Sequence, residues 1–227
     1  MVTGPRQWRR SRRRVVKVHG LLRTGTNYVS ALLGENLDVR VLGPEVGGWK
    51  HGPIEGADGV TVAVVAKSPF TWLESFYKWE LIRERTQAPT LTEFAGAPLS
   101  HPQLAAVWGA GDPVDAWNKA TGSWVAAQQT GDVLVLRYED VIDDVGGQLD
   151  KFTDRFPTRR RRRHPVDIES RVGPGWKTEG PVDRGHYTGQ TPTGLDEALV
   201  ALLEERLDRE LMRALAYGDR GEQRPLG

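Results

Sequence analysis

The sequence has no cysteine, only two methionines and no long run of apolar residues. Without a thiol the chain can form no disulfide, hold no metal through thiolate and use no cysteine as a nucleophile. No apolar segment approaches the roughly 20 residues that a membrane-spanning helix needs. Lys17 interrupts the apolar residues that follow the basic N-terminus, which argues against a signal peptide. We therefore expect a cytoplasmic protein without a membrane span.

The chain has no large excess of either charge, since the net charge of its 227 residues is only +1. Arginines nevertheless gather in two runs. Residues 6–14 contain six arginines and no acid, and a second run occupies residues 159–163. Both runs fit either solvated segments or sites that attract an anionic partner. The first run contains one aromatic residue, Trp8, the second has none, and neither has a known fold motif, so both are weak evidence for nucleic acid as that partner. The sequence leaves the oligomeric state open.

Strand-like and helix-like segments alternate along the chain. The segments 15–19, 60–66 and 133–137 are rich in apolar β-branched residues, as buried parallel strands are, and 39–42 is a fourth candidate strand. Apolar spacing and capping signals predict helices at 27–36, 69–85, 113–129, 141–156 and 195–217.

This alternation is typical of βαβ units. We therefore predict an α/β fold, a three-layer sandwich with a central, mainly parallel sheet. The sequence predicts one domain at residues 15–218, between a basic N-terminal tail at 1–14 and a C-terminal tail at 219–227.

The first strand, a glycine-containing loop and the first helix have the outline of a P-loop. Gly20 and Gly25 have the separation found in G-x-x-x-x-G-K-[ST], and amides at the start of the helix would face an anion. Thr26 stands where that motif has its lysine, and the loop carries Arg23 instead. The sequence therefore indicates either a phosphate loop poorly suited to ATP or an ordinary tight turn.

The segment Arg23-Thr24-Gly25-Thr26-Asn27-Tyr28 resembles the 5′-phosphosulfate loop of sulfotransferases that use 3′-phosphoadenosine 5′-phosphosulfate (PAPS). In that family the basic residue contacts the sulfate and the bridging oxygen, which implies this role for Arg23. The resemblance also implies that the rest of the loop holds the 5′-phosphate of the cofactor, namely Thr24, Gly25, Thr26 and Asn27.

A second segment resembles the 3′-phosphate site of the same family, a basic residue at a strand end followed eight positions later by a helical serine. Here Lys67 ends the strand at 60–66, and Ser75 lies eight residues on. Lysine replaces the usual arginine, so the forked hydrogen bonds of a guanidinium are lost. Ser68 and the proline after it also predict a helix start that the Ser68 hydroxyl caps.

Two further segments resemble the family more loosely. Tyr138 matches a tyrosine that approaches the adenine, although a strand end followed by an acidic helix start explains it equally well. Arg171 and Gly173 match a loop that closes over the 3′-phosphate. The arginines at 159–163 are a rival source of that charge.

The general base is expected outside the nucleotide segments. The family has a Lys-x-His segment after its second strand, and Lys50-His51 lies in the corresponding interval, one residue shorter. The resemblance implies that His51 takes the proton of the acceptor, a role that suits a group titrating near neutrality. Lys50 would steady the charge of the transferred group. Glu45 and Glu55 are rival bases.

The resemblance implies a PAPS-dependent sulfotransferase that acts by in-line displacement and releases adenosine 3′,5′-bisphosphate. The acceptor would be a hydroxyl or an amine of a small molecule, a sugar or a natural product, and the sequence does not choose among them. No metal is implied. Two alternatives stay open: a P-loop-type small-molecule kinase, and a non-catalytic protein that binds nucleotide or RNA.

Overall fold

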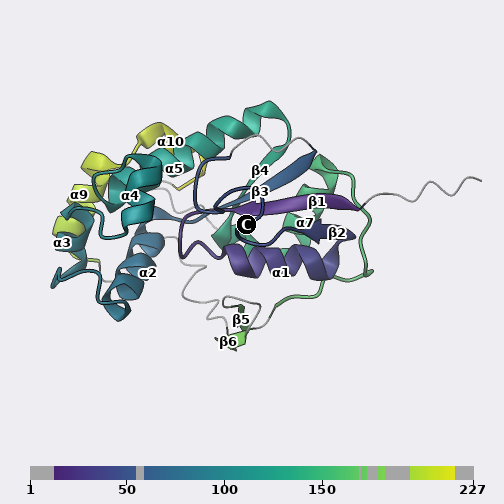
Figure 1. Cartoon of the computed structure of the whole chain (residues 1–227), viewed down its shortest axis with the longest axis horizontal. Coiled ribbons are helices and arrows are strands. Elements are labelled where there is room, and N and C mark those ends of the chain that lie inside the picture. Colours follow the sequence, from purple (N-terminus) through teal and green to yellow (C-terminus); the bar gives the residue numbers. More distant parts are fainter. Residues whose placement is uncertain (1–12, 55–58, 169, 173–177, 182–194, 218–227) are drawn as a thin grey trace, which may run out of the picture.

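The computed structural model describes residues 13–54, 59–168, 170–172, 178–181 and 195–217, and it centres on a four-stranded sheet (Figure 1). The spatial order is β2-β1-β3-β4, and all neighbouring pairs are parallel. The strands are β1 (Arg14–His19), β2 (Val39–Val41), β3 (Val60–Ala66) and β4 (Val133–Arg137). Helices lie on both faces of the sheet, so the predicted three-layer α/β fold is confirmed.

The parallel register brings the carboxyl ends of three strands to one edge of the sheet. His19 at the end of β1 pairs with Val64, and Ala66 at the end of β3 pairs with Arg137 at the end of β4. The loops that leave these strands are therefore neighbours, at the edge where open α/β sheets bind ligands. At the other edge β1 begins at Arg14, one residue inside the predicted tail.

Alternate strand residues point to opposite faces and divide the interior into two cores. Val16 and Val18 of β1 pack with α1, α6 and α7, whereas Val62 and Val64 of β3 pack with α2 and α5. These helices are α1 (Thr26–Asn36), α2 (Pro69–Ile82), α5 (Pro113–Ala127), α6 (Tyr138–Asp143) and α7 (Val145–Arg155).

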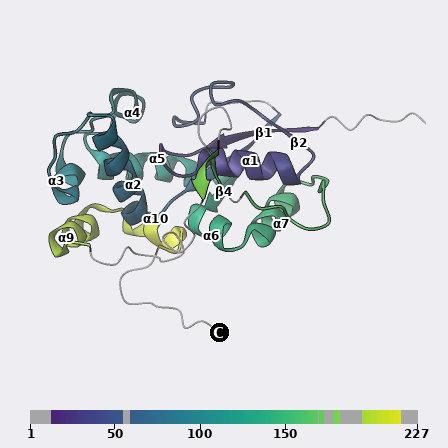
Figure 2. The same ribbon diagram turned by 90° about the horizontal axis from the view of Figure 1, so that it is seen from below.

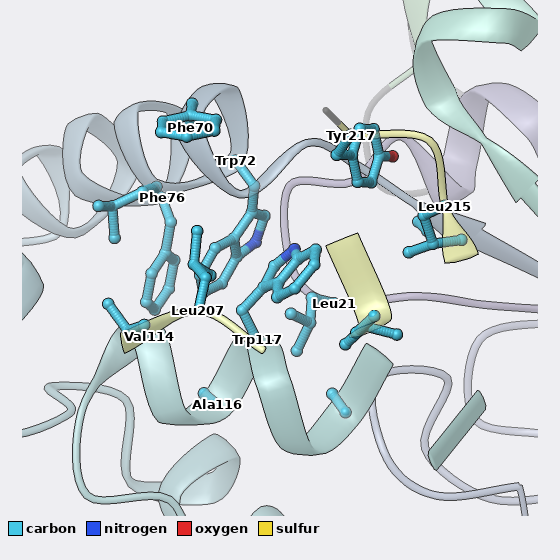
Figure 3. Packing of buried hydrophobic residues seen from close by; sticks show 14 of the residues in the cluster. Leu21, Phe70, Trp72, Phe76, Val114, Ala116, Trp117, Leu207, Leu215 and Tyr217 are labelled. Atoms are coloured by element: carbon cyan, nitrogen blue, oxygen red, sulfur yellow. The ribbon is translucent and has the colours of Figure 1, made fainter. Parts of the chain in front are cut away.

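Further helices extend the second core beyond the sheet. They are α3 (Leu91–Gly96), α4 (Pro102–Trp108), α9 (Glu197–Arg206) and α10 (Arg209–Ala214), with the 3₁₀ turn η1 (Gln128–Thr130) after α5. Figures 1 and 2 both show α3, α4, α9 and α10 gathered around α2 and α5. Trp72 of α2 and Trp117 of α5 lie together there, with Leu21 from the turn after β1 beside them (Figure 3). The turn after β1 is thus anchored in the larger core.

Two parts of the chain lie outside these layers. β5 (Ser170–Val172) and β6 (Thr178–Pro181) form a separate antiparallel pair, and β5 packs beside α1. Residues 43–54, which follow β2, consist of turns and irregular segments. Across the described ranges, no helix has the length and apolar character to cross a membrane.

Two predicted helices are each broken in two by an aspartate that caps the second piece. The helix predicted at 141–156 becomes α6 and α7, because Asp144 Oδ1 accepts the amide of Gly147 (2.8 Å). The helix predicted at 195–217 becomes α9 and α10, because Asp208 accepts two amides in the first turn of α10. Each carboxylate satisfies amides that lack a partner at a helix start.

Glu139, buried in α6, ties the turn after β3 to the end of the described chain. Its Oε1 accepts the backbone N–H of Ser68 (2.9 Å), and its Oε2 accepts the hydroxyl of Tyr217 (3.0 Å). Burial, followed by the charge of Glu139, raises the pKa of Tyr217 well above its usual value, so the phenol remains a donor. The Glu139 carboxylate thus takes the place of a side-chain cap at the start of α2.

We expect Glu139→Ala to lower the free energy of unfolding by about 2–4 kcal/mol, because it removes hydrogen bonds to a charged group and leaves buried donors without partners. Urea unfolding followed by circular dichroism measures this loss. Asp143→Ala removes an exposed carboxylate of the same helix and should stay within about 0.5 kcal/mol of the wild type. Equal stabilities for the two variants would contradict the role given to Glu139.

Candidate functional site

The turn between β1 and α1 requires glycine at two positions. A Cβ atom at Gly20 would lie 2.7 Å from the carbonyl oxygen of Val65, and one at Gly25 would overlap the ring of Tyr138. Gly25 also has a φ of +88°, in the left-handed region that favours glycine. The glycine spacing seen in the sequence therefore reflects a tight turn against the backbone of β3 and the ring of Tyr138.

Arg23 lies exposed in this turn, with a φ of +69° that residues other than glycine seldom adopt. Thr24 closes the turn beside it by donating its hydroxyl to the carbonyl of Leu21 (2.8 Å), and Leu21 is buried in the larger core. Residues in such conformations persist where the surroundings fix them, and they concentrate at functional sites. The backbone thus holds the predicted sulfate-contacting arginine at the surface of the turn.

The N-terminus of α1 directs backbone amides toward the same turn. Gly25 precedes the helix, and in the part of the chain that the structure describes no side chain caps its first turn. The amides of Thr26 and Asn27 have no intrahelical acceptor, and the helix dipole adds partial positive charge. An anion here would accept hydrogen bonds from these amides. The geometry is compatible with the predicted role of Thr24, Gly25, Thr26 and Asn27.

The segment between β2 and β3 brings Lys50 and His51 onto the turn. The amide of Gly20 donates to the Lys50 carbonyl (3.0 Å), and His51 Nδ1 donates to the Gly20 carbonyl (2.5 Å). Lys50 Nζ donates to Asn27 Oδ1 (2.6 Å) in the first turn of α1. An ammonium thus reaches this helix start from a separate segment, although the loop lacks the P-loop lysine. Arg23, Lys50 and His51 thus belong to or contact one turn.

Burial lowers the pKa of both Lys50 and His51. The pKa of His51 falls to about 3, mainly through burial, against the effect of its hydrogen bond to Gly20. The expectation that His51 titrates near neutrality is therefore wrong for the protein alone. The pKa of Lys50 falls to about 8, through burial and then the charge of Lys17, with Glu45 opposing. An anion at the turn would reverse both shifts.

The hydrogen bond to Gly20 fixes the tautomer of His51. A carbonyl can only accept, so Nδ1 carries the proton and Nε2 keeps its lone pair at neutral pH. Trp108 Nε1 donates to the His51 carbonyl (2.9 Å), and the ring of Trp49 lies edge-on with centroids 5.2 Å apart. One ring nitrogen of His51 is thus committed to the turn, and the other can accept a proton.

Lys67, directly after β3, lies at the same edge of the sheet and is buried. Its Nζ lies 5.4 Å from the centre of the Tyr138 ring, and its carbonyl accepts a hydrogen bond from Trp117 Nε1 (3.0 Å). The ring of Tyr138 also occupies the space beside Gly25. Three of the predicted nucleotide segments therefore meet here. Ser75 lies half-buried within α2.

Three buried polar atoms at this edge have no hydrogen-bond partner among the described residues: His19 Nδ1, Ser68 Oγ and Arg137 Nε. They stand at the carboxyl ends of β1, β3 and β4. The prediction that the Ser68 hydroxyl caps α2 is wrong, because Glu139 accepts the Ser68 amide and the hydroxyl caps nothing. Buried polar groups are nearly always paired, so this grouping fits a polar ligand at the edge.

The rival and more distant predictions have different outcomes. Glu45 is exposed on the 43–48 segment, and its charge opposes the lowering of the Lys50 pKa. Arg171 lies in β5, which packs beside α1. Glu55 and Gly173 lie outside the described residues.

The arginines at 159–163 lie at the far end of α1. The amide of Arg161 donates to the carbonyl of Asn36 (2.8 Å), the last residue of α1, and Arg162 pairs with Glu35 (2.6 Å). A helix of 11 residues spans about 16 Å, which separates this run from the turn after β1. The run therefore lies away from the turn after β1, and its part as a rival source of charge for the 3′-phosphate stays a prediction.

Sequence reasoning missed Lys17 and His19, which share one face of β1. The ammonium of Lys17 is held by backbone carbonyls of the 43–48 segment. The pKa of His19 falls to about 4, chiefly through burial, against a hydrogen bond with the backbone of Gly52. A signal was present, since both residues alternate with valines in the buried part of the strand. A polar stripe on a buried strand indicates partners on that face.

Comparison with protein-family models gives no match for this chain, and none of the curated proteins matches it. The resemblance to sulfotransferases therefore rests on the sequence motifs alone.

We expect the two buried histidines to make the protein sensitive to acid. In the folded state the pKa is about 4 for His19 and about 3 for His51, against an ordinary value of 6.5. The unfolded chain therefore binds more protons below about pH 6.5, so stability falls as the pH drops from there toward 4. Each histidine contributes a slope of roughly 1.4 kcal/mol per pH unit in this window.

Urea midpoints measured between pH 7 and pH 4.5 test this expectation. His51→Asn should reduce the slope by about one proton, because the titrating ring is removed. Ile82→Ala, at an exposed position without a titrating group, is the control and should keep the wild-type slope. An unchanged slope in His51→Asn would show that His51 does not titrate in this way.

Proposed function

We propose that this protein is an enzyme that transfers a sulfuryl group from PAPS to a hydroxyl or an amine of a small-molecule, sugar or natural-product acceptor. The observation that carries the proposal is the gathering of cations from separate segments at one sheet edge. Arg23 lies in the turn after β1, Lys50 contacts the start of α1, and Lys67 follows β3. Among the described residues, no carboxylate forms a salt bridge with Arg23 or Lys50.

The described residues suit a ligand with two separate anionic groups. At the turn, Arg23, Lys50 and the first amides of α1 would hold the phosphosulfate end. Lys67, with the unpaired hydroxyl of Ser68, lies at the end of the next strand and would hold the 3′-phosphate together with Ser75. Tyr138 lies beside both Gly25 and Lys67, where it would contact the nucleoside between them.

PAPS supplies an activated sulfuryl group, and the chain supplies charge and a proton acceptor. Arg23 and Lys50 would stabilise the negative charge that grows on the transferring and bridging oxygens. His51 would take the acceptor proton at Nε2, since Nδ1 is already bound to Gly20. Nearby anionic groups favour the charged form of an imidazole, which raises the low basicity of His51 when the site is filled. Glu45 and Glu55 remain rival bases.

Ligand discrimination tests this proposal against the two alternatives. We expect adenosine 3′,5′-bisphosphate to raise the melting temperature much more than ATP with Mg²⁺ at matched concentration. ATP has no 3′-phosphate, so it cannot make the contact proposed for Lys67. A ligand at 100 times its dissociation constant adds roughly 2.7 kcal/mol of stability. Lys67→Met should remove most of the shift. Equal shifts from the two nucleotides would favour a kinase, and binding of RNA without the bisphosphate would favour a non-catalytic binding protein.

Arg23→Ala tests the assignment of transition-state charge. We expect turnover to fall on the order of 10²–10³-fold, as when one oxyanion donor is lost. Affinity for the bisphosphate product should change little, because that product lacks the sulfate that Arg23 would contact. Arg40→Ala removes an exposed arginine on β2 and is the matched control. Lost product affinity with surviving turnover would make Arg23 a nucleotide anchor instead.

A further inference from the structure

Lys17 is a buried lysine in the middle of β1, with 2% of its surface exposed. Its ammonium donates to four backbone carbonyls of the segment after β2, at distances of 2.5 to 3.1 Å. The four acceptors are Gly43, Pro44, Val46 and Gly48. An ammonium has three N–H groups, so four acceptors satisfy it completely.

The segment 43–48 adopts a conformation that depends on this cation. Gly47 and Gly48 have φ values of +74° and +90°, in the region that other residues seldom adopt. Four carbonyl dipoles converge on one point, which is unfavourable without a positive charge between them. Every residue from 43 to 48 is exposed on its outer side, so Lys17 is the main anchor that the described contacts give this segment.

The same strand holds the residues that follow. His19 bonds to the backbone of Gly52, and Gly20 bonds to both Lys50 and His51. A single residue separates Gly48, held by Lys17, from Lys50. The segment from 43 to 52 is thus fastened along β1 and Gly20, and the residues held by Lys17 are close in the chain to the two that contact the turn.

We propose that Lys17 is a positioning residue that fixes Lys50 on Asn27 and His51 on Gly20 through the carbonyls of the 43–48 segment. The effect of this positioning on catalysis rests on the proposed function, whereas the positioning of the two side chains does not. If Lys17 served stability alone, a buried apolar side chain of similar length would serve as well, because burying a charge has a large desolvation cost. A lysine is required where its N–H groups hold a backbone segment.

Lys17→Met tests the proposal, because methionine has a similar length and lacks the ammonium. We expect the 43–48 segment to detach and the hydrogen bond from His51 Nδ1 to Gly20 to be lost. The imidazole ¹⁵N spectrum should then change from one fixed tautomer to an exchanging mixture. An unchanged His51 spectrum in Lys17→Met would overturn the proposal, whether or not the protein transfers sulfuryl groups.

Val18→Ala is the matched control. Val18 lies on the same strand, but its side chain packs in the opposite core with α1. The truncation should lower stability by roughly 1–3 kcal/mol while leaving the His51 spectrum as in the wild type. If Val18→Ala changed the spectrum as much as Lys17→Met, loss of stability would explain both results and the positioning role would be wrong.

Chemical rescue provides a second variant in case Lys17→Met does not fold. Lys17→Ala leaves space for a small cation, and methylammonium should restore the wild-type His51 spectrum because it has three N–H donors. Tetramethylammonium has the charge without donors and should not. No restoration by either cation, or equal restoration by both, would contradict the role of the N–H groups.

Activity measurements distinguish a failure of the proposed function from a failure of the positioning role of Lys17. With PAPS and an acceptor, turnover of Lys17→Met should fall on the order of 10²-fold, as for a misplacement of about 1 Å, while affinity for the bisphosphate product stays nearly unchanged. Absence of sulfuryl transfer in the wild type would count against the proposed function. Normal turnover in Lys17→Met would count against the positioning role.

Discussion

Gly20 supports the rest of the site, because both of its backbone polar groups hold the segment that carries Lys50 and His51. Its N–H bonds to the Lys50 carbonyl, and its carbonyl accepts from His51 Nδ1. No side chain fits at this position, since the backbone of Val65 and the hydroxyl of Thr24 fill the space. The packing that shapes the turn before α1 therefore also positions Lys50 and His51, the proposed charge-stabilising residue and general base.

Several basic groups at and near this edge of the sheet have lowered pKa values. Burial lowers the pKa of Lys17, Lys50, His19 and His51, so positive charge there is disfavoured in the protein alone. The charge of Glu45 opposes the lowering of the Lys50 pKa, but Glu45 is exposed. Shifted pKa values of this kind concentrate at functional sites, and an anionic ligand would relieve them.

The layers of the fold could be predicted because local sequence determines them. Apolar β-branched runs such as 60–66 read as buried strands, and the glycines of the turn after β1 had the spacing of a phosphate loop. The broken helices were missed although their capping aspartates, Asp144 and Asp208, are visible in the sequence. Continuous apolar spacing predicts one helix in each segment, but the capping aspartate starts a second helix there.

The site could be predicted only as far as its residues are adjacent in sequence. The Arg23 turn and the Lys50-His51 pair were found from motifs, but the low pKa of His51 depends on burial by segments distant in the chain. The partners of Lys17 lie 26 to 31 residues away. The place of the arginines at 159–163, beyond the last turn of α1, likewise depends on tertiary hydrogen bonds.

A crystal structure with adenosine 3′,5′-bisphosphate tests the central claim most directly, since it locates both phosphates at once. The proposed function predicts the 5′-phosphate on the amides of Gly25, Thr26 and Asn27, and the 3′-phosphate within hydrogen-bond reach of Lys67 Nζ. A bisphosphate bound away from the carboxyl edge of the sheet, or with Lys67 contacting no phosphate, would contradict it.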